Sequence, residues 1–282
     1  MINYLYIFPE IIITSALCFI IVLDLFLPNK LKYISYYLIQ LSLIFCAYYI
    51  YSHISYLTDN NSELYDTSIF SNIFKIFILL SLAMIFYYTS VFLKYFNIFR
   101  TEYFLITLFG LLGMMIMISS QNMLLLYLGI ELLSLSLYSV IAFNKNSLFS
   151  SEAAVKYYIL GAISSGFLLF GISLIYGLTG SLNFNEIFTH IASFNITNGI
   201  DNVQVIGLLF ALIFILISLS FKFGAAPFHM WIPDVYHGSI ITTTLLLSTI
   251  PKIAVFVILI KLLTNVFSGL FLFWADMVII LS

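Results

Sequence analysis

Charge is what this 282-residue sequence has least of: 8% of its residues are charged, and 63% are hydrophobic. Soluble domains carry about 25% charged residues, so a water-soluble enzyme is excluded. The two cysteines, Cys18 and Cys46, lie in apolar runs without a C-x-x-C spacing, so any redox cofactor must sit on another chain. The net charge of −2 offers no basic face for nucleic acid. The sequence therefore predicts an integral membrane protein.

Long apolar runs predict the fold class, an all-α, polytopic transmembrane helical bundle. A helix needs about 20 apolar residues to cross about 30 Å of hydrocarbon, and continuous runs argue against a β-barrel. The first four residues contain no basic residue, so no removable targeting peptide is expected. The expected spans cover residues 5–27, 33–57, 69–93, 103–119, 123–143, 152–178, 203–223 and 251–267, with a last run starting at Leu270.

Loop charges predict the orientation of this bundle, because Lys and Arg are retained on the cytoplasmic or equivalent side of a membrane. The loops after spans one, three and five contain Lys30, Lys32, Lys94, Arg100 and Lys145. The loops after spans two, four and six contain Asp59, Glu63, Asp66, Glu186 and Asp201. These three alternate loops contain no Lys or Arg. The N-terminus is therefore expected outside, with the basic loops inside.

Some ionisable residues lie inside apolar runs or at their edges. An ionised group at the bilayer centre costs several kcal/mol and is tolerated mainly where it faces a bundle interior or a watery cavity. Function is therefore to be sought among these residues. They are Glu10, Asp24, Lys75, Glu131, Lys156, Lys222, Lys252, Lys261 and Asp276.

Glu131 has apolar neighbours for more than two turns on both sides, so its side chain cannot reach water as a long lysine can. It must be paired or protonated, which favours proton handling over a neutral carboxylic acid hydrogen-bonded between helices. Lys156 lies on the next, antiparallel span, where small residues at four-residue spacing allow close helix approach. A Glu131–Lys156 pair is therefore expected. The alternative is that Lys156 is an interfacial anchor beside Glu152.

Lys222 closes an apolar run and is followed by a segment with two prolines, Pro227 and Pro233. Neither proline can donate to the carbonyl four residues earlier, so the helix is expected to break here. Freed carbonyls next to a lysine make a hydratable pocket, which is tolerated at membrane depth where it is buried or lines a cavity. The alternative is a surface loop with Lys222 at the lipid headgroups.

Lys252 directly follows Pro251, and hydroxyl side chains that include Thr243 and Ser248 occupy the preceding stretch. Hydroxyls and loosened backbone can hold waters, so Thr243 and Ser248 are candidate members of a proton relay. An anchor at the end of a helix is the alternative role for Lys252.

Two histidines, His229 and His237, flank the expected break and titrate nearest physiological pH. Both are therefore candidate proton relays, and hydrogen-bonded packing residues are an equal alternative. No third ligand lies at a suitable spacing, so no metal site is expected.

Short motifs surround these charged positions. They are IFPE at 7–10, YLGIEL at 127–132, EAAVK at 152–156, FKFGAAPFHMWIPDVY at 221–236, and PK at 251–252. In these segments the sequence resembles the antiporter-like membrane subunits of respiratory complex I, and most closely their chain 2 group. The resemblance extends over most of the chain, and the segment 221–236 is its most specific part.

The resemblance implies a subunit that translocates protons, driven by NADH-to-quinone electron transfer in other subunits. Glu131 matches the family's fifth-helix glutamate, Lys156 its sixth-helix lysine, Lys222 the lysine of its broken seventh helix, and Lys252 its eighth-helix lysine. These four are the implied proton-transfer residues. FMN, iron–sulfur clusters and quinone are expected on partner subunits, with no cofactor on this chain.

The resemblance also implies a division of the chain into three parts. Residues 1–100 form an N-terminal three-helix segment, 101–269 the antiporter-like proton-transfer helices, and 270–282 the start of an incomplete helix. The sequence differs from the family pattern in two respects. Family members commonly have Glu-Gly after the tyrosine that ends the broken-helix motif, whereas this chain has His237-Gly238. The run from Leu270 is too short to span, and the family's inverted second half is absent. A separate C-terminal half is expected, and a truncated chain is the alternative.

The expected mechanism is electrostatic. Two charges 4 Å apart couple by about 4 kcal/mol at an effective dielectric of about 20, enough to switch a buried lysine between holding and releasing a proton. Lys222 would load from the inner side, and Lys252 with waters would relay. The alternatives are a subunit of a free-standing multisubunit cation/proton antiporter, or a non-transporting membrane assembly scaffold.

The expected partners are other complex I subunits, especially neighbouring antiporter-like subunits and the C-terminal half, together with membrane lipids. The Phe, Tyr, Ile and Asn content suits an A+T-rich organellar genome. The expected location is therefore the mitochondrial inner membrane, as a multi-pass protein with its N-terminus on the intermembrane-space side and its basic loops in the matrix. A bacterial plasma membrane is the alternative.

Overall fold

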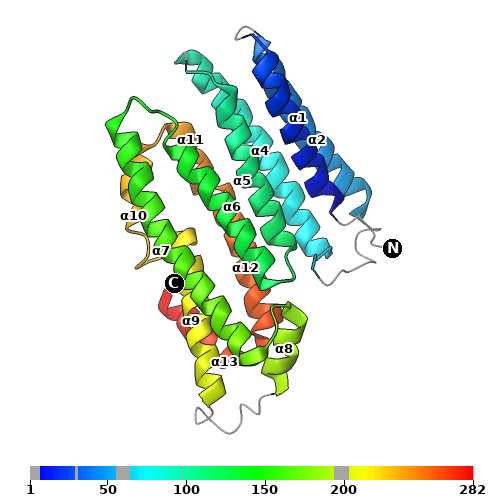
Figure 1. The fold of residues 1–282 in the computed structure, drawn as a ribbon, viewed down its shortest axis with the longest axis vertical. Coiled ribbons are helices and arrows are strands. Elements are labelled where there is room, and N and C mark those ends of the chain that lie inside the picture. The colour runs from blue at the N-terminus through cyan, green and yellow to red at the C-terminus, as the bar shows by residue number, and fades with distance from the viewer. Residues whose placement is uncertain (1–6, 29–30, 55–63, 97, 194–202, 282) are drawn as a thin grey trace.

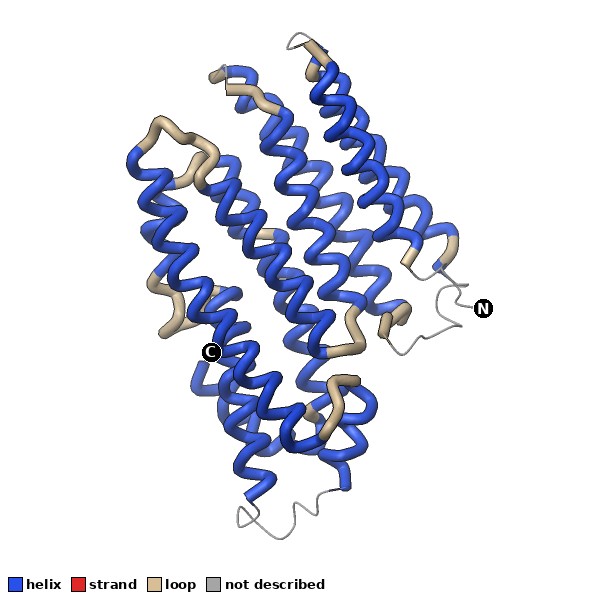
Figure 2. The backbone as a smooth tube through the Cα atoms, in the orientation of Figure 1, coloured by secondary structure: helices blue, strands red, loops and turns tan. Residues whose placement is uncertain are grey.

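The computed structural model describes residues 7–28, 31–54, 64–96, 98–193 and 203–281. These residues form helices joined by turns, with two isolated bridges, Tyr65 to Ser120 and Asn122 to Asn183, and no strand in the described part (Figure 2). Four residues used above for the orientation lie outside the described residues: Lys30, Asp59, Glu63 and Asp201. The predicted all-α class is confirmed.

The helices follow the apolar runs of the sequence. Eight helical segments in the described residues are long and apolar enough to cross a membrane, which confirms a polytopic bundle. The helices are α1 (Phe8–Phe26), α2 (Tyr33–Ser52), α4 (Ile69–Tyr95), α5 (Thr101–Ser119), α6 (Met123–Ile141), α7 (Leu148–Thr179), α8 (Phe184–Ser193), α9 (Val203–Phe223), α10 (Trp231–Gly238), α11 (Ile241–Ser248), α12 (Ile250–Lys261), a π-helix (Leu262–Val266), a 3-10 turn (Ser268–Leu270) and α13 (Phe271–Leu281).

The eighth span is the one boundary that the sequence misplaced substantially. It begins at Ile241 and continues to Val266, whereas the expected start was Pro251. Pro251 lies in the first turn of α12, where its missing N–H is not needed, so it follows a kink at Thr249 and does not start the span. The short helix α8, between the sixth and seventh spans, was also not expected.

The helices are arranged around α5. In Figure 1, α1 and α2 form one edge of the molecule, α4, α5 and α6 its centre, and α7 and α10 the opposite edge. In the most apolar stretch of α5, 78% of the residues are buried inside the bundle, compared with 28% in that of α1. Gly113 and Gly129 bring α5 and α6 together, because a Cβ on Gly113 would lie 2.7 Å from the Gly129 carbonyl oxygen.

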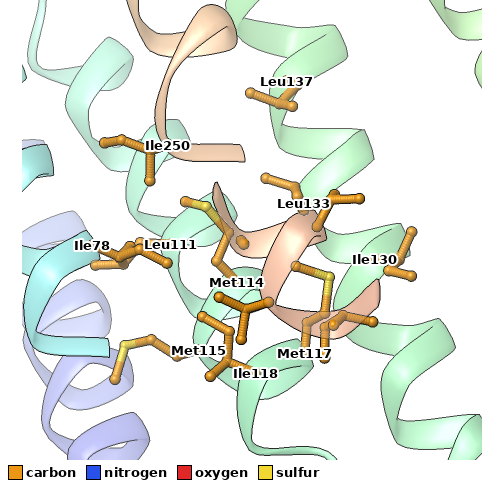
Figure 3. Packing of buried hydrophobic residues seen from close by; sticks show 14 of the residues in the cluster. Ile78, Leu111, Met114, Met115, Met117, Ile118, Ile130, Leu133, Leu137 and Ile250 are labelled. Atoms are coloured by element: carbon orange, nitrogen blue, oxygen red, sulfur yellow. The ribbon is translucent and has the colours of Figure 1, made fainter. Parts of the chain in front are cut away.

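Apolar side chains fill the space between α4, α5, α6 and α12. Figure 3 shows Ile78, Met114, Met117, Leu133 and Ile250 pointing into this space from the four helices. Each of these five side chains is almost completely buried. Flexible methionines fill irregular gaps well, so they suit a centre where four helices meet.

Two buried ion pairs tie the N-terminal helices to this centre. Lys75 Nζ on α4 lies 2.6 Å from Glu10 Oε1 on α1, and Lys261 Nζ on α12 lies 2.9 Å from Asp66 Oδ2 before α4. Lys261 Nζ also donates to the carbonyl oxygen of Ser120, at 2.7 Å. This contact satisfies a free carbonyl at the C-terminal end of α5. Both lysines, first considered as functional candidates, are therefore paired with carboxylates.

Asp66 lies outside the spans, just before α4. Burial opposes its ionisation, but the Lys261 ammonium and a 2.6 Å hydrogen bond from the Ser71 hydroxyl hold the pKa of this carboxyl below its ordinary value. A lowered folded-state pKa stabilises the fold above the unfolded pKa, and this contribution is lost as pH falls through the folded value. The Asp66 carboxyl is therefore ionised at neutral pH.

Replacing Lys75 by methionine is expected to reduce the free energy of unfolding by about 3–5 kcal/mol, because Glu10 is left buried without a cation. The double variant Glu10→Gln/Lys75→Met removes both charges at similar volume and is expected to recover most of this loss. Thermal unfolding of the purified protein in detergent measures both variants. A single variant as stable as the wild type would show that the pair does not hold α1 against α4.

Candidate functional site

The expected helix break is present after Lys222. Helix α9 ends at Phe223, and Gly224 takes a left-handed conformation with φ of 80°. The Gly224 N–H donates to the Ser220 carbonyl at 2.8 Å, and the Trp231 indole N–H donates to the Phe221 carbonyl at 2.9 Å. The carbonyls freed by the break are thus partly satisfied by the loop itself.

Pro233 does not contribute to this break, in contrast to the expectation from the sequence. It lies in the first turn of α10, which starts at Trp231, and a proline is tolerated in a first turn because the N–H there has no partner within the helix. The break therefore covers residues 224–230 and contains Pro227 only.

Lys222 is buried where the break begins, at 7% exposure. Its Nζ donates to the Ser134 Oγ on α6 at 2.6 Å and lies 6.0 Å from the centre of the Tyr138 ring. Ser134 in turn donates to the Ile130 carbonyl at 2.7 Å. The ammonium therefore has a neutral hydroxyl as its hydrogen-bond partner, and the alternative of a lysine at the lipid headgroups is wrong.

Three residues of α6 form one stripe facing this lysine. Glu131, Ser134 and Tyr138 have the spacing i, i+3, i+7, which places them on one helix face. Among the described residues, the buried Oε1 of Glu131 has no hydrogen-bond partner. The carboxylate lies one turn from the serine that holds the ammonium, so its charge acts on Lys222 through space.

The Tyr138 hydroxyl fits against α7 at a glycine. A Cβ added to Gly161 would lie 2.0 Å from the Tyr138 Oη, so a larger residue would displace the tyrosine. Tyr157 of α7 packs edge-to-face on Tyr138, at 5.1 Å between ring centres, and its ring is tilted against Trp231 at 4.6 Å. These rings close the side of the site that faces α7 and α10.

Lys252 lies on α12 beside a second tyrosine. Its Nζ is 6.0 Å from the centre of the Tyr236 ring on α10. Thr243 of α11 is buried, and its hydroxyl donates to the Tyr103 hydroxyl at 3.5 Å. Lys252 thus lies beside the helix that follows the break, and Thr243 faces Tyr103 of α5; their relay roles stay predictions.

Several buried polar atoms in this region have no hydrogen-bond partner in the described part of the chain. Such atoms in native proteins are normally satisfied by ordered water. They lie on α4, α6, α10 and α11, close to the two lysines or to Tyr103. They are Thr89 Oγ1, Glu131 Oε1, Tyr138 Oη, Tyr236 Oη and Thr242 Oγ1.

The expected Glu131–Lys156 pair is not formed, and this prediction is wrong. Lys156 Nζ lies 2.7 Å from Glu152 Oε1, one turn away on α7, and 2.9 Å from Asp234 Oδ2 on α10. Its side chain is 44% exposed. The small residues of α7 do allow close approach, but they admit the Tyr138 ring at Gly161, so the lysine points away from α6.

The remaining relay candidates are dispersed. His229 and His237 are exposed, and the His237 ring lies edge-on to Phe149 at 5.9 Å. The Ser248 hydroxyl donates to the Leu245 carbonyl of its own helix at 3.1 Å. None of these three contacts Lys222 or Lys252 in the described hydrogen bonds and ion pairs. Their relay roles stay predictions.

The buried lysines fall into two groups according to their hydrogen-bond or ion-pair partners. Lys75 and Lys261 each form an ion pair with a carboxylate. Lys222 contacts a hydroxyl, which favours its charged form much less, so it can lose a proton more easily. Ser134 and Tyr138 were not singled out from the sequence, although their spacing from Glu131 on one helix face could have identified them.

No group of three or more His, Cys, Asp or Glu side chains that could hold a metal ion occurs in the described residues. The groups that are present at this site, a lysine, hydroxyls and a carboxylate, can transfer protons.

Comparisons with known proteins find relatives over nearly the whole chain. The family described as NADH:quinone oxidoreductase/Mrp antiporter, TM, matches residues 120–282. NADH-quinone oxidoreductase subunit N of Ruthia magnifica is 41% identical over 277 residues, covering 97% of this chain and 56% of that protein. Subunit N of Thioalkalivibrio sulfidiphilus is 43% identical over 284 residues, covering 99% and 57%. The chain thus spans somewhat more than half the length of these curated relatives.

Two solved structures share the fold. A chain of respiratory complex I from Thermus thermophilus with bound aureothin has a TM-score of 0.72 and 27% identity, covering 90% of this chain and 52% of that chain. A chain of the membrane-bound sulfane sulfur reductase, an archaeal respiratory membrane complex, has a TM-score of 0.70 and 20% identity, covering 91% and 52%. The second similarity shows the fold alone.

Proposed function

The chain belongs to the NADH:quinone oxidoreductase/Mrp antiporter family of membrane subunits, and from this premise we propose that it translocates protons within an NADH-quinone oxidoreductase. Subunit N relatives at 36–43% identity over nearly the whole chain support this assignment. FMN, iron–sulfur clusters and quinone belong, on this proposal, to partner subunits. The chain itself supplies proton-transfer groups.

One observation carries the proposal: a lysine buried at a broken helix is hydrogen-bonded to a neutral hydroxyl, one turn from a carboxylate whose Oε1 is buried. An ionised Glu131 favours a protonated Lys222, and neutralising Glu131 favours release of the proton. Ser134, which holds the ammonium at 2.6 Å, fixes its position during this exchange. A charge change on one side of the site is thereby converted into proton movement on the other.

Lys252 is the proposed next residue on the proton route after Lys222. The unpartnered hydroxyls of Tyr236 and Thr242 lie between the broken helix and α11, and they support a hydrated route from Lys222 toward Lys252. Thr243 would extend this route to Tyr103. His229, His237 and Ser248 are retained only as candidate relays outside this route.

A second hydrophobic unit is proposed to complete the subunit and to supply the proton outlet. In the described chain, α13 has no buried residue, and Asp276 on it is exposed among apolar side chains. An apolar hollow lined by Leu216, Phe223, Phe256 and Val278 opens between α9, α12 and α13. We infer that a separate polypeptide with a Pro- or Gly-interrupted helix and one buried lysine covers this surface.

The proposed partners beyond this unit are neighbouring antiporter-like subunits and the surrounding lipids. The curated relatives are bacterial proteins, which supports a bacterial plasma membrane. The mitochondrial inner membrane, expected from composition, stays a prediction.

Purification of the native assembly tests the proposed function. If the chain is part of an NADH-quinone oxidoreductase, flavin and iron–sulfur absorbance should migrate with it through a sizing column. A free-standing cation/proton antiporter, which the family also includes, would carry neither absorbance, and neither would an assembly scaffold. Absence of both absorbances from the intact assembly would contradict the proposal.

The orientation predicted from the loops can be tested by cysteine labelling. Single cysteines at Lys94, Arg100 and Lys145 should react with a membrane-impermeant reagent from one side only. Cysteines at Asp59 and Asp201 should react from the other side, because Lys and Arg are retained on the inner face. Labelling of both sets from one side would refute this topology.

A further inference from the structure

An exposed cluster of charges lies on α7 and α10, at the edge of the molecule opposite α1 and α2 (Figure 1). It consists of Glu152, Lys156 and Asp234, joined by the two ion pairs of Lys156. Their side chains are 59%, 44% and 54% exposed, respectively. We call these three residues the α7–α10 charge cluster. None of their described ion pairs involves a residue of the proton-transfer site built around Lys222.

The depth of the cluster follows from neighbouring helices. The Ser150 hydroxyl on α7 donates to the carbonyl of Ile141, the last residue of α6. Ser150 therefore lies at the same height in the bundle as the end of α6. Lys156 is six residues further along α7, or about 9 Å at 1.5 Å per residue. Lys156 therefore lies inside Leu148–Thr179, an apolar helix long enough to cross a membrane.

Helix α10 brings Asp234 to the same depth. Gly238 fits closely against α7, since a Cβ there would lie 2.6 Å from both the Phe149 carbonyl oxygen and the Ala153 Cβ. From this contact α10 follows α7, and Asp234 meets Lys156 at 2.9 Å. A half-exposed carboxylate at this depth is not tolerated against acyl chains, so protein must cover it.

The surroundings of the cluster are those of a buried interface. Val155 and Ile159, on either side of Lys156, are 57% and 52% exposed, Tyr158 is 53% exposed, and Met230, before α10, is 77% exposed. Apolar, aromatic and methionine side chains around a polar centre are typical of interface cores. With two carboxylates and one ammonium, the cluster carries one negative charge in excess.

We propose that the α7–α10 charge cluster is the docking surface for a transmembrane helix of a neighbouring subunit, and that this helix places a Lys, Arg or protonated His against Asp234 and Glu152. The inference rests on the proposed function in one respect, namely that the chain works among other membrane subunits. It assigns Lys156 to subunit contact and not to the Glu131 site. A cation from the partner neutralises the excess charge and satisfies both carboxylates.

Photo-cross-linking in the assembled complex tests this surface. A photoreactive benzoylphenylalanine at Val155 is expected to form adducts with one other membrane subunit, and the same residue at Met230 gives a second probe if the first prevents assembly. Benzoylphenylalanine at Leu137, which is buried inside the bundle, should form adducts only within this chain. The cross-linked partner peptide, identified by mass spectrometry, should contain a basic residue within one helical turn of the adduct.

Two further outcomes would overturn the proposal: adducts with lipid or with a second copy of this chain, or a partner helix without a basic residue near the adduct. Charge reversal by Asp234→Lys adds a second readout, with an expected loss of at least 80% of the assembled complex on native gels, whereas Asp234→Asn should lose less. Equal assembly of Asp234→Lys and wild type would also overturn it. Neither readout uses proton pumping, so failure here leaves the Lys222 site to be judged separately.

Discussion

Replacing Lys222 by methionine is expected to lower NADH-driven proton pumping at least about tenfold in the assembled complex. Methionine fills a similar volume but has no proton to hold, and loss of a positioned proton-transfer group typically slows a reaction by about 10²–10⁴. Quinone reduction should fall in parallel if electron transfer is coupled to this site. Acidification measured with a pH-sensitive dye in proteoliposomes reports the first quantity, and NADH oxidation the second.

The matched control for this variant is Lys145→Met, because Lys145 lies in an exposed loop. It removes the same charge without touching a buried site, so pumping should stay near the wild-type rate. The complex must also remain intact on native gels for the comparison to count. Wild-type pumping by an assembled Lys222→Met complex would show that Lys222 is not on the proton route.

Replacing Glu131 by glutamine is expected to lower both pumping and quinone reductase activity while the complex still assembles. Glutamine keeps the shape and hydrogen-bonding capacity of the side chain and removes its charge. A coupling of about 1.4 kcal/mol between two ionisable groups changes a protonation equilibrium about tenfold. An effect of about tenfold on pumping is therefore expected.

Glu102→Gln provides the control for Glu131, since Glu102 is exposed in the first turn of α5 and its charge contributes only a few tenths of a kcal/mol there. A second comparison, Glu131→Asp, keeps the charge but shortens the side chain and should retain more pumping than glutamine. If Glu131→Gln pumps normally in an intact complex, the electrostatic link from α6 to Lys222 is absent.

Hydropathy and proline chemistry were sufficient to predict the spans and the break after Lys222, because both are local properties of the chain. The division at residues 100 and 269 stays a prediction. The eighth span was predicted to start at Pro251 and was therefore too short. In the structure Pro251 lies in the first turn of α12, where a proline follows a kink without ending the span. Hydropathy and proline positions therefore predict the helices well, but they predict the positions of kinks less well.

Partner choice could not be predicted, because it depends on contacts between residues far apart in sequence. Lys156 is paired with Asp234, 78 residues away, and not with the carboxylate on the neighbouring span. Lys75 and Lys261 looked equivalent to Lys222 in the sequence, yet each is held by a carboxylate. What distinguishes Lys222 is a neutral partner on α6, and the contact of its Nζ with Ser134, 88 residues away, is visible only in the structure.

The central claim is that Lys222 gives up and regains a proton during turnover, and the variant Lys222→Arg tests it most directly. Arginine keeps a positive charge and can donate to Ser134, but it cannot be deprotonated in a protein. Pumping by the assembled Lys222→Arg complex, measured in proteoliposomes beside wild type and Lys222→Met, is predicted to be as low as that of the methionine variant. Pumping near the wild-type rate would mean that the site needs only a fixed cation, and it would contradict proton transfer through Lys222.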